Sequence, residues 1–232
     1  GVVIGGGCDN IAVAMEDAVA IGNGAGATQK AVALGNMALA NGFASVAIGD
    51  EAQAMGVTAI SIGYKAGLSQ QGDSNVAIGQ NTGQYVNGNE NTALGQYAGG
   101  SVIGNKNTAV GVNAGGLAQG DRNAYMGYLS GSGNRGNDNL NLGTQAGQGA
   151  WGNVSVALGL TAGYGAQGDA NVGIGQKAGS SINGSRNTSM GNGAGFGITG
   201  SDNIALGSNT NQGLPTFLNN TGFTARGDNN IG

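Results

Sequence analysis

The sequence predicts an all-β fold, a parallel β-solenoid or β-roll built from repeats of 13–16 residues. The first observation is a five-residue motif that recurs through the chain, as in Asn75–Gly79, Asn91–Gly95 and Asn203–Gly207. The second is its regular spacing, and the third is a composition with 51 Gly, one Pro and 9% charged residues. Two short strands and two turns account for one unit, so each unit makes one coil, and stacked coils bury a shared core.

The spacing of the motif glycines divides the chain into four segments. Residues 1–17 are an irregular lead-in, and residues 18–67 carry repeats of 13–14 residues. Residues 68–210 follow a strict 16-residue period. Residues 211–232 break the phase and start a further repeat, which predicts a segment of a longer protein. We expect the cross-section of the coil to change at Gly63, where the period changes.

Each 16-residue unit has further constant positions. A second Gly follows the motif Gly by four residues and a third follows it by nine. Gly closes a strand where the backbone is left-handed or crowded. After the third Gly come Asp, Asn or Ser, then a variable residue, then Asn. Because the variable position accepts every kind of charge, we expect it in solvent: Ser74, Glu90, Lys106, Arg122, Asp138, Val154, Ala170, Arg186 and Asp202.

The motif strand has two faces, because successive side chains of a strand point in opposite directions. We expect the first and third positions, such as Val76 and Ile78, to point into the roll, together with the Thr residues that replace Val. The Ala between them is then a smooth outer surface. Since such a thin coil buries few side chains, we expect several chains to pack side by side on this Ala column. Tyr125 and Asn141 interrupt the column, and the packing there should loosen.

The segment Ser45–Ala54, with Ser-Val-Ala-Ile-Gly followed by Asp-Glu-Ala-Gln-Ala, resembles the YadA-type head repeat of trimeric autotransporter adhesins. Residues 18–27 and 31–40 match the same pattern. The resemblance implies a left-handed parallel β-roll, a homotrimer and a role in attachment. From residue 63 to 207 the strand is kept, but the period is 16 and Ala-x-Ala becomes Ala-Gly. Similar lengthened repeats occur in phage tail and virion fibres, which also trimerise.

The composition argues against several function classes. The net charge is −4 with scattered Lys and Arg, so the chain lacks the basic stripe that nucleic acid requires. No apolar run approaches the roughly 20 residues that span a bilayer, so we expect no membrane insertion in this segment. The single Cys8 cannot form an intrachain disulfide.

No catalytic, cofactor-binding or metal-binding residue is predicted. The chain has no His, and its 12 carboxylates are dispersed, whereas a glycosidase needs two of them a few ångströms apart. Gly-Asp pairs at 72–73, 120–121 and 168–169 resemble calcium-binding repeats, but they return only in every third coil. We therefore interpret these Asp residues as turn caps.

The predicted function is a non-enzymatic, extracellular attachment fibre that binds a protein or glycan of a host cell or matrix. Its candidate ligand-facing residues lie just after the motif Gly: Tyr64, Lys65, Tyr97, Tyr128 and Lys177. An alternative is the rod of a phage tail or capsid fibre. A further alternative, from a different class, is a polysaccharide-degrading β-helix.

Overall fold

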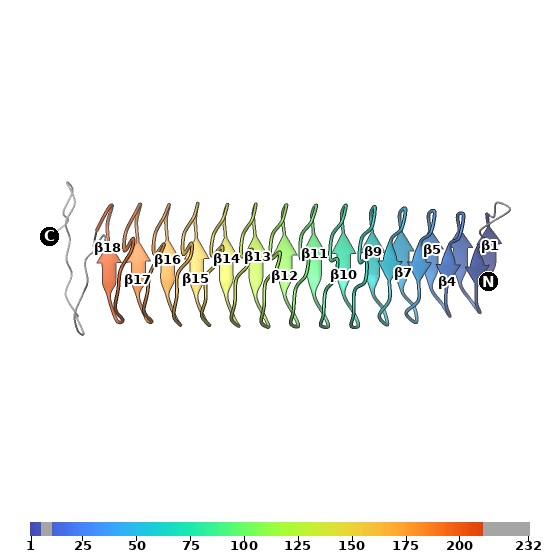
Figure 1. The fold of residues 1–232 in the computed structure, drawn as a ribbon, viewed down its shortest axis with the longest axis horizontal. Helices are drawn as coiled ribbons and strands as arrows, with labels where there is room; N and C mark the ends of the chain where they lie inside the picture. The colour runs from blue at the N-terminus through green and yellow to red at the C-terminus, as the bar shows by residue number, and fades with distance from the viewer. Residues whose placement is uncertain (6–10, 211–232) are drawn as a thin grey trace. The chain divides into compact units, whose positions relative to one another are not determined.

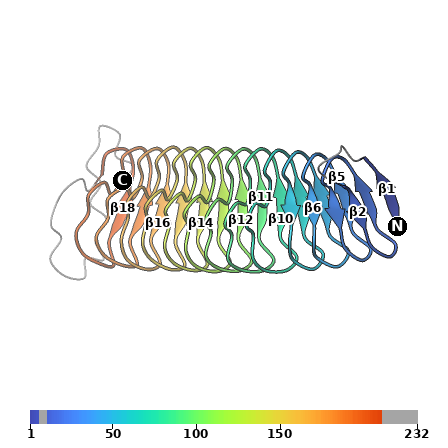
Figure 2. The same cartoon turned by 45° about the vertical axis from the view of Figure 1, so that its right-hand side comes forward.

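The computed structural model describes residues 1–5 and 11–210, and Cys8 and the segment 211–232 lie outside these ranges. The regular elements in the described ranges are β-strands, and paired strands run parallel. Each coil contributes its strand to a column of strands, with turns between them (Figures 1 and 2). The predicted all-β parallel solenoid is therefore confirmed. No helix in the described ranges is long and apolar enough to cross a membrane.

The chain divides into two compact units, residues 1–117 and residues 118–232. The main sheet of the first unit has the order β1-β3-β5-β7-β9-β10-β11-β12, and that of the second has the order β13-β14-β15-β16-β17-β18. Main-sheet strands of the first unit are β1 (Val2–Ile4), β3 (Val19–Ile21), β5 (Val32–Leu34), β7 (Val46–Ile48), β9 (Ile60–Ile62), β10 (Val76–Ile78), β11 (Thr92–Leu94) and β12 (Thr108–Val110). Those of the second unit are β13 (Ala124–Met126), β14 (Leu140–Leu142), β15 (Val156–Leu158), β16 (Val172–Ile174), β17 (Thr188–Met190) and β18 (Ile204–Leu206).

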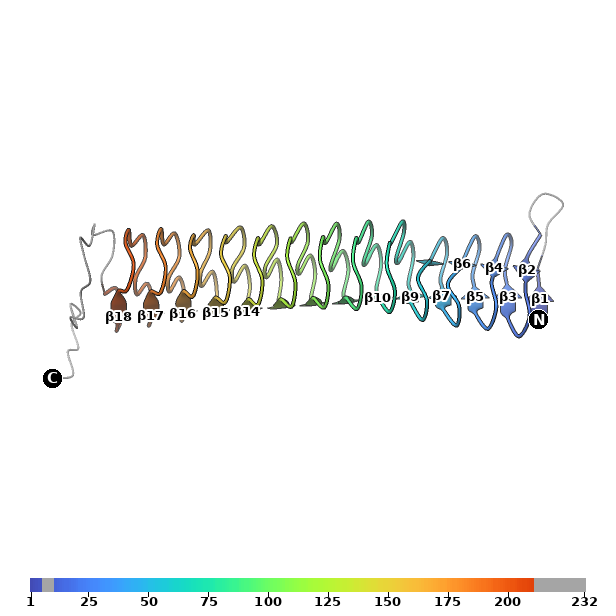
Figure 3. The ribbon, with the colours of Figure 1, turned by 90° about the horizontal axis from the view of Figure 1, so that it is seen from below.

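Within residues 1–5 and 11–210, a second, smaller sheet is confined to the early coils. It contains β2 (Val13–Ala14), β4 (Gly26–Ala27), β6 (Leu39–Ala40) and β8 (Gln53–Ala54), which form their own column in Figure 3. In later coils of the same unit this position holds single parallel bridges, such as Gln71 to Asn87. The coil therefore changes its second side between β8 and the Gln71 bridge, in the region where the sequence period lengthens.

The motif strands pair in register from one coil to the next. Val76, Ala77 and Ile78 lie beside Thr92, Ala93 and Leu94. The motif Gly closes the strand because two constraints meet there. Gly79 has φ +134°, and a Cβ on it would lie 2.8 Å from the carbonyl oxygen of Gly95 in the next coil. The predicted crowded, left-handed position is thus confirmed.

The two faces of the motif strand are the reverse of the prediction. Ala77 is fully buried, whereas Ile78 is 36% exposed. The reason is the thinness of the coil: a Cβ on Gly83, across the interior, would lie only 2.7 Å from the Cβ of Ala77. Only small side chains fit between segments this close, so the branched side chains point outward. The expectations that Val and Ile fill the roll and that Ala forms its outer surface were wrong.

The column-breaking residues lie inside the coil as well. Tyr125 and Asn141 are buried in the second unit, where the Tyr125 ring packs over Gly131. The Tyr125 hydroxyl donates to Asn134 Oδ1 at 3.4 Å. Nearby, a cavity of about 20 Å³ has Asn141, Ala157 and Gly173 in its lining. Both side chains therefore lie in the interior of one chain and not on the outer surface at which looser packing was expected.

A ladder of buried Asn side chains joins successive coils. Asn75 Nδ2 donates to the carbonyl of Gly88 at 2.7 Å, and Asn75 Oδ1 accepts from the backbone N–H of Asn91 at 2.8 Å. The same pattern links Asn171, Asn187 and Asn203 in the second unit. These bonds satisfy backbone groups that the turns would otherwise leave unpaired in the interior.

Candidate interaction surfaces

The outward face of the main sheet carries no charged residues, and its side chains are apolar except for Thr92, Thr108 and Thr188. In the first unit it contains Ile78 and Leu94, both more than a third exposed, with half-buried Val76 and Val110 beside them. In the second unit Met126, Leu142 and Met190 occupy the same strand position and are likewise exposed. Because the strands pair in register, these side chains form a continuous row within each unit. Contiguous apolar surface of this kind marks an interaction site on soluble proteins.

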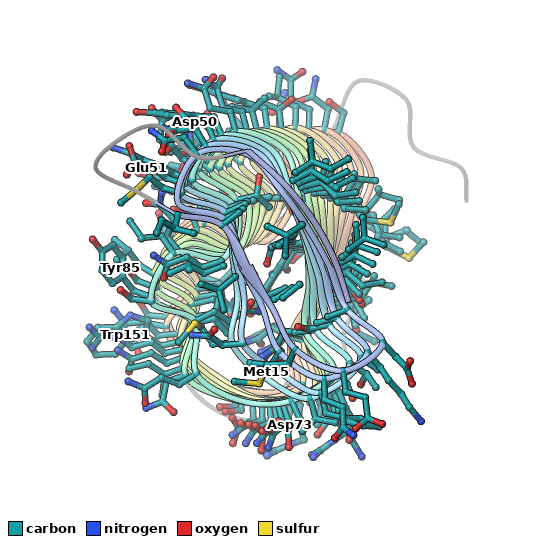
Figure 4. All side chains as sticks on the ribbon, turned by 90° about the vertical axis from the view of Figure 1, so that its right-hand side faces the viewer. Met15, Asp50, Glu51, Asp73, Tyr85 and Trp151 are labelled. Carbon is teal, nitrogen blue, oxygen red and sulfur yellow. The ribbon has the colours of Figure 1, made fainter. Side chains whose placement is uncertain are left out.

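The charged residues that the structure describes in the first unit lie at the corners of the coil, away from this face. Figure 4 shows Asp50 and Glu51 at one end of the cross-section, Asp73 at the other, and Tyr85 projecting from the side between them. The chain runs from the Asp73 corner through β10 to the next corner, so the sheet lies on the side away from Tyr85. Each coil therefore has an apolar sheet side, two polar corners and a back side.

The sequence-predicted Tyr64 and Lys65 lie together at a corner. Lys65 Nζ is 5.0 Å from the centre of the Tyr64 ring and 3.5 Å from Glu51 Oε2. Hydrogen bonding to Tyr64 and the charge of Glu51 raise the pKa of Lys65 above its usual value. The ammonium group thus has two contacts on its own chain, and both lie at the surface, where such pairs are weak.

The other predicted ligand-facing residues are exposed but dispersed. Tyr97 lies at the same corner of the first unit, two coils further along the chain. Tyr128 and Lys177 lie in the second unit and are separated by three coils. The structure therefore brings together the adjacent pair Tyr64 and Lys65, whereas the other three occupy separate turns.

Two Asp residues of the Gly-Asp pairs, Asp73 and Asp169, cap turns, as predicted. Asp73 Oδ1 accepts from the backbone N–H of Val57, and Asp169 Oδ1 accepts from that of Asn153, both at 2.8 Å. Asn89 and Asn137 perform the same role in neighbouring coils. Among the described residues, no group of three or more Cys, Asp and Glu side chains is placed to hold a metal ion.

The variable column is exposed, as predicted, at seven of its nine positions, including Glu90, Lys106 and Arg122, whereas Ala170 and Asp202 are half-buried. Its charges pair between adjacent coils. The Arg122 guanidinium contacts Asp138 at 2.6 Å, and Arg186 contacts Asp202 at the same distance. Hydrogen bonding to the guanidinium lowers the pKa of each carboxyl group. Exposed pairs of this kind contribute little to stability.

One aromatic contact on the back side was not predicted to be a site. The guanidinium carbon of Arg135 lies 4.8 Å from the centre of the Trp151 ring. Both residues occupy the same column of parallel bridges, and Trp151 projects outward in Figure 4. The two residues are 16 positions apart in the sequence, so the repeat period could have predicted that they lie side by side in adjacent coils.

Comparison of the chain with protein-family models and with curated protein sequences gives no match.

Proposed function

We propose that the chain is a segment of a non-enzymatic, extracellular attachment fibre in which three copies pack side by side. In this proposal each copy is a left-handed β-roll with coils of 13–16 residues. The sheet faces of the three copies meet at the centre, and the corners and back sides face outward. The fibre then presents many weak contacts along its length, and avidity comes from their repetition.

The observation that carries this proposal is the uncharged apolar sheet face. Leu94 in the first unit and Leu142 in the second are each nearly half exposed in the single chain. Burying such side chains contributes about 25 cal/mol for each Å² removed from water. A second and third copy of the same chain carry an apolar row with the same spacing, so they match it coil by coil.

The non-enzymatic part of the proposal is supported by the engagement of the carboxylates. Asp73 and Asp169 are held by backbone N–H groups, and Asp138 and Asp202 are held by guanidinium groups. A polysaccharide-degrading β-helix would require a pair of carboxylates facing a substrate. Loss of viscosity in a panel of polysaccharides incubated with the protein would overturn this part.

The assembly is tested by light scattering on the purified chain. We expect the mass of three chains. The double variant Leu94→Glu with Leu142→Glu places charges on the sheet face and should give the mass of one chain, with an unchanged circular dichroism spectrum. Val154→Glu is the control for a Glu placed away from the sheet face, because it adds one such charge at an exposed corner position and should leave the trimer intact. A wild-type chain with the mass of a monomer would contradict the proposal.

A phage tail or capsid fibre rod is the second candidate. It is favoured by the coil-to-coil offset of 16 residues that the Asn ladder displays, since lengthened repeats resemble those of such fibres. The two candidates share the trimeric packing and differ in what the segment is attached to. Sequencing the gene on both sides of this segment distinguishes a membrane-anchoring domain from a virion-attachment domain.

A further inference from the structure

The back side of three successive coils in the second unit presents three columns of residues: 132, 148 and 164; 133, 149 and 165; and 135, 151 and 167. Hydrogen bonds between coils hold these columns in line. Gly149 N–H donates to the carbonyl of Ser132, and Gly165 N–H donates to that of Gln148, both at 2.9 Å. In the third column, parallel bridges connect Arg135 to Trp151 and Trp151 to Gln167.

The middle column lacks side chains, and the backbone does not require this. Gly149 and Gly165 have φ of +67° and +61°, and Ser181 has φ +57° at the equivalent position of the following coil. A Cβ added to Gly149 or Gly165 would meet no heavy atom within 4 Å. Space for a side chain therefore exists, and the glycines leave a strip of bare backbone between two rows of side chains.

The two rows beside this strip carry exposed aromatic rings and amides. Trp151 is 52% exposed on one side and Tyr164 is 44% exposed on the other. The Arg135 guanidinium lies over the Trp151 ring and limits its freedom. Gln167 continues the Trp151 row and is exposed. An aromatic ring such as that of Trp151, held in this way, offers a large contact area with little loss of conformational entropy on binding.

The charges on this surface restrict the chemistry of a ligand. Residues 131–135, 147–151 and 163–167 contain one charged side chain, Arg135, and no carboxylate. The nearby carboxylates, Asp138 and Asp169, lie in the turn that follows this surface and are engaged there. Amide groups both donate and accept hydrogen bonds, and ring faces pack against C–H groups. An uncharged ligand with many hydroxyl groups and flat apolar faces fits this combination.

We propose that this strip, which runs along Gly149 and Gly165 between Trp151 and Tyr164, binds an uncharged polysaccharide chain. Sugar rings pack on the two aromatic side chains, and their hydroxyl groups bond to Gln167 and to the exposed backbone. Coils repeat at the strand spacing of about 4.8 Å, close to the length of one sugar residue, so a linear glycan can follow the stack. The inference deepens the proposed attachment function, but the strip lies on a single chain and does not require the trimer.

Affinity electrophoresis in gels that contain a neutral polysaccharide tests the proposal. The panel consists of xyloglucan, glucomannan and mixed-linkage β-glucan, with polygalacturonate as the charged comparison. We expect retardation of the wild-type protein by at least one neutral polymer. Failure of all three to retard it, or retardation by polygalacturonate alone, would overturn the proposal.

Three variants locate the binding surface. Trp151→Ala with Tyr164→Ala should weaken binding by about tenfold or more, the factor that corresponds to 1.4 kcal/mol. Gly149→Leu should weaken it similarly by filling the strip while both rings remain, and Leu117 at the equivalent position with φ +60° indicates that the backbone tolerates Leu. Val154→Ala, at a corner, should bind as the wild type does. Unchanged binding by either of the first two variants, with a native circular dichroism spectrum, would overturn the proposal.

Light scattering on the same samples separates this proposal from the proposed function. If the protein is a monomer and the neutral polymer retards it, the glycan site stands and the trimer is refuted. If the protein is a trimer and no neutral polymer retards it, the trimeric fibre stands and the glycan site is refuted.

Discussion

Tyr125 is the largest fully buried side chain among the described residues. Because its phenol is buried, we expect the stability of the second unit to decrease at alkaline pH. Burial raises the pKa of its phenol above the usual value. Below about pH 10 the folded and unfolded chains are both protonated, and the contribution of Tyr125 is complete. Above that pH the unfolded chain releases the proton first. The free energy of unfolding should then fall by about 1.4 kcal/mol per pH unit until the folded-state pKa is reached.

Urea denaturation between about pH 8 and pH 11 measures this dependence, with Tyr125→Phe as the matched variant. The variant keeps the ring, and Asn134 Oδ1 still accepts from Asn139 Nδ2 at 3.2 Å. We expect the variant to lose less stability than the wild type as the pH rises above 10. If the free energies of unfolding of the two proteins fell in parallel as the pH rises, Tyr125 would not be buried and protonated in the folded chain.

Residue patterns alone predicted the alternation of the motif strand but not which face is inside. The sequence shows that Val76 and Ile78 share one face and that Ala77 has the other. A hydrophobicity argument then places the larger apolar residues in the core. The distance across the coil decides otherwise, because Gly83 approaches Ala77 too closely for a larger side chain. That distance depends on how the turns fold back, which spacing along the sequence does not reveal.

At the scale of the element, the Asn ladder makes each turn depend on the next coil. Asn91 Nδ2 donates to the carbonyl of Gly104 at 2.8 Å, and Asn91 Oδ1 accepts from the backbone N–H of Asn107 at 3.0 Å. Asn91→Ala should therefore destabilise the protein by about 1–3 kcal/mol for each buried group left unpaired. Asn91→Ser should cost less, because Ser155 at the equivalent position of the second unit accepts from Asn171 N–H through its hydroxyl at 3.3 Å.

Thermal and urea unfolding of the two variants measure the ranking. Glu90→Ala is the control, because this neighbouring residue is exposed and belongs to the solvent-facing column. It should unfold as the wild type does. An Asn91→Ala protein as stable as the Glu90→Ala protein would show that the ladder is not a source of stability.

The position of the motif strand was the best-predicted feature, whereas the second strand expected in every unit is present only in the early coils of the described residues. The strand Val76–Ile78 lies within the predicted motif Asn75–Gly79, and its parallel pairing follows from the repeat. The burial of Asn75 was missed, since Asn after Gly-Asp signals a turn in solvent. The bridge column that contains Arg135 and Trp151 was missed too, because its residues share no type that a pattern would detect.

At the scale of the whole molecule, the coils are interchangeable because each one contacts mainly its neighbours. The repeat therefore predicted the solenoid, whereas assembly and ligand depend on surfaces whose residues vary. Residues 156–171 make one complete coil, from Val156 at the start of β15 to Asn171 in the ladder. Inserting a second copy of this coil after Asn171 preserves every register, because Val172 then pairs with the new Val156 as it pairs with the present one.

We expect the protein with the duplicated coil to keep its circular dichroism per residue and to unfold at the same temperature or higher. Inserting residues 156–163 alone at the same place is the matched comparison. Half a coil would move the following strand opposite turn residues, and the buried Gly173 would no longer lie beside Ala157. This protein should lose cooperative unfolding and expose apolar surface to a fluorescent dye. If the whole-coil and half-coil insertions were equally destabilising, then register between neighbouring coils would not be what holds the stack together.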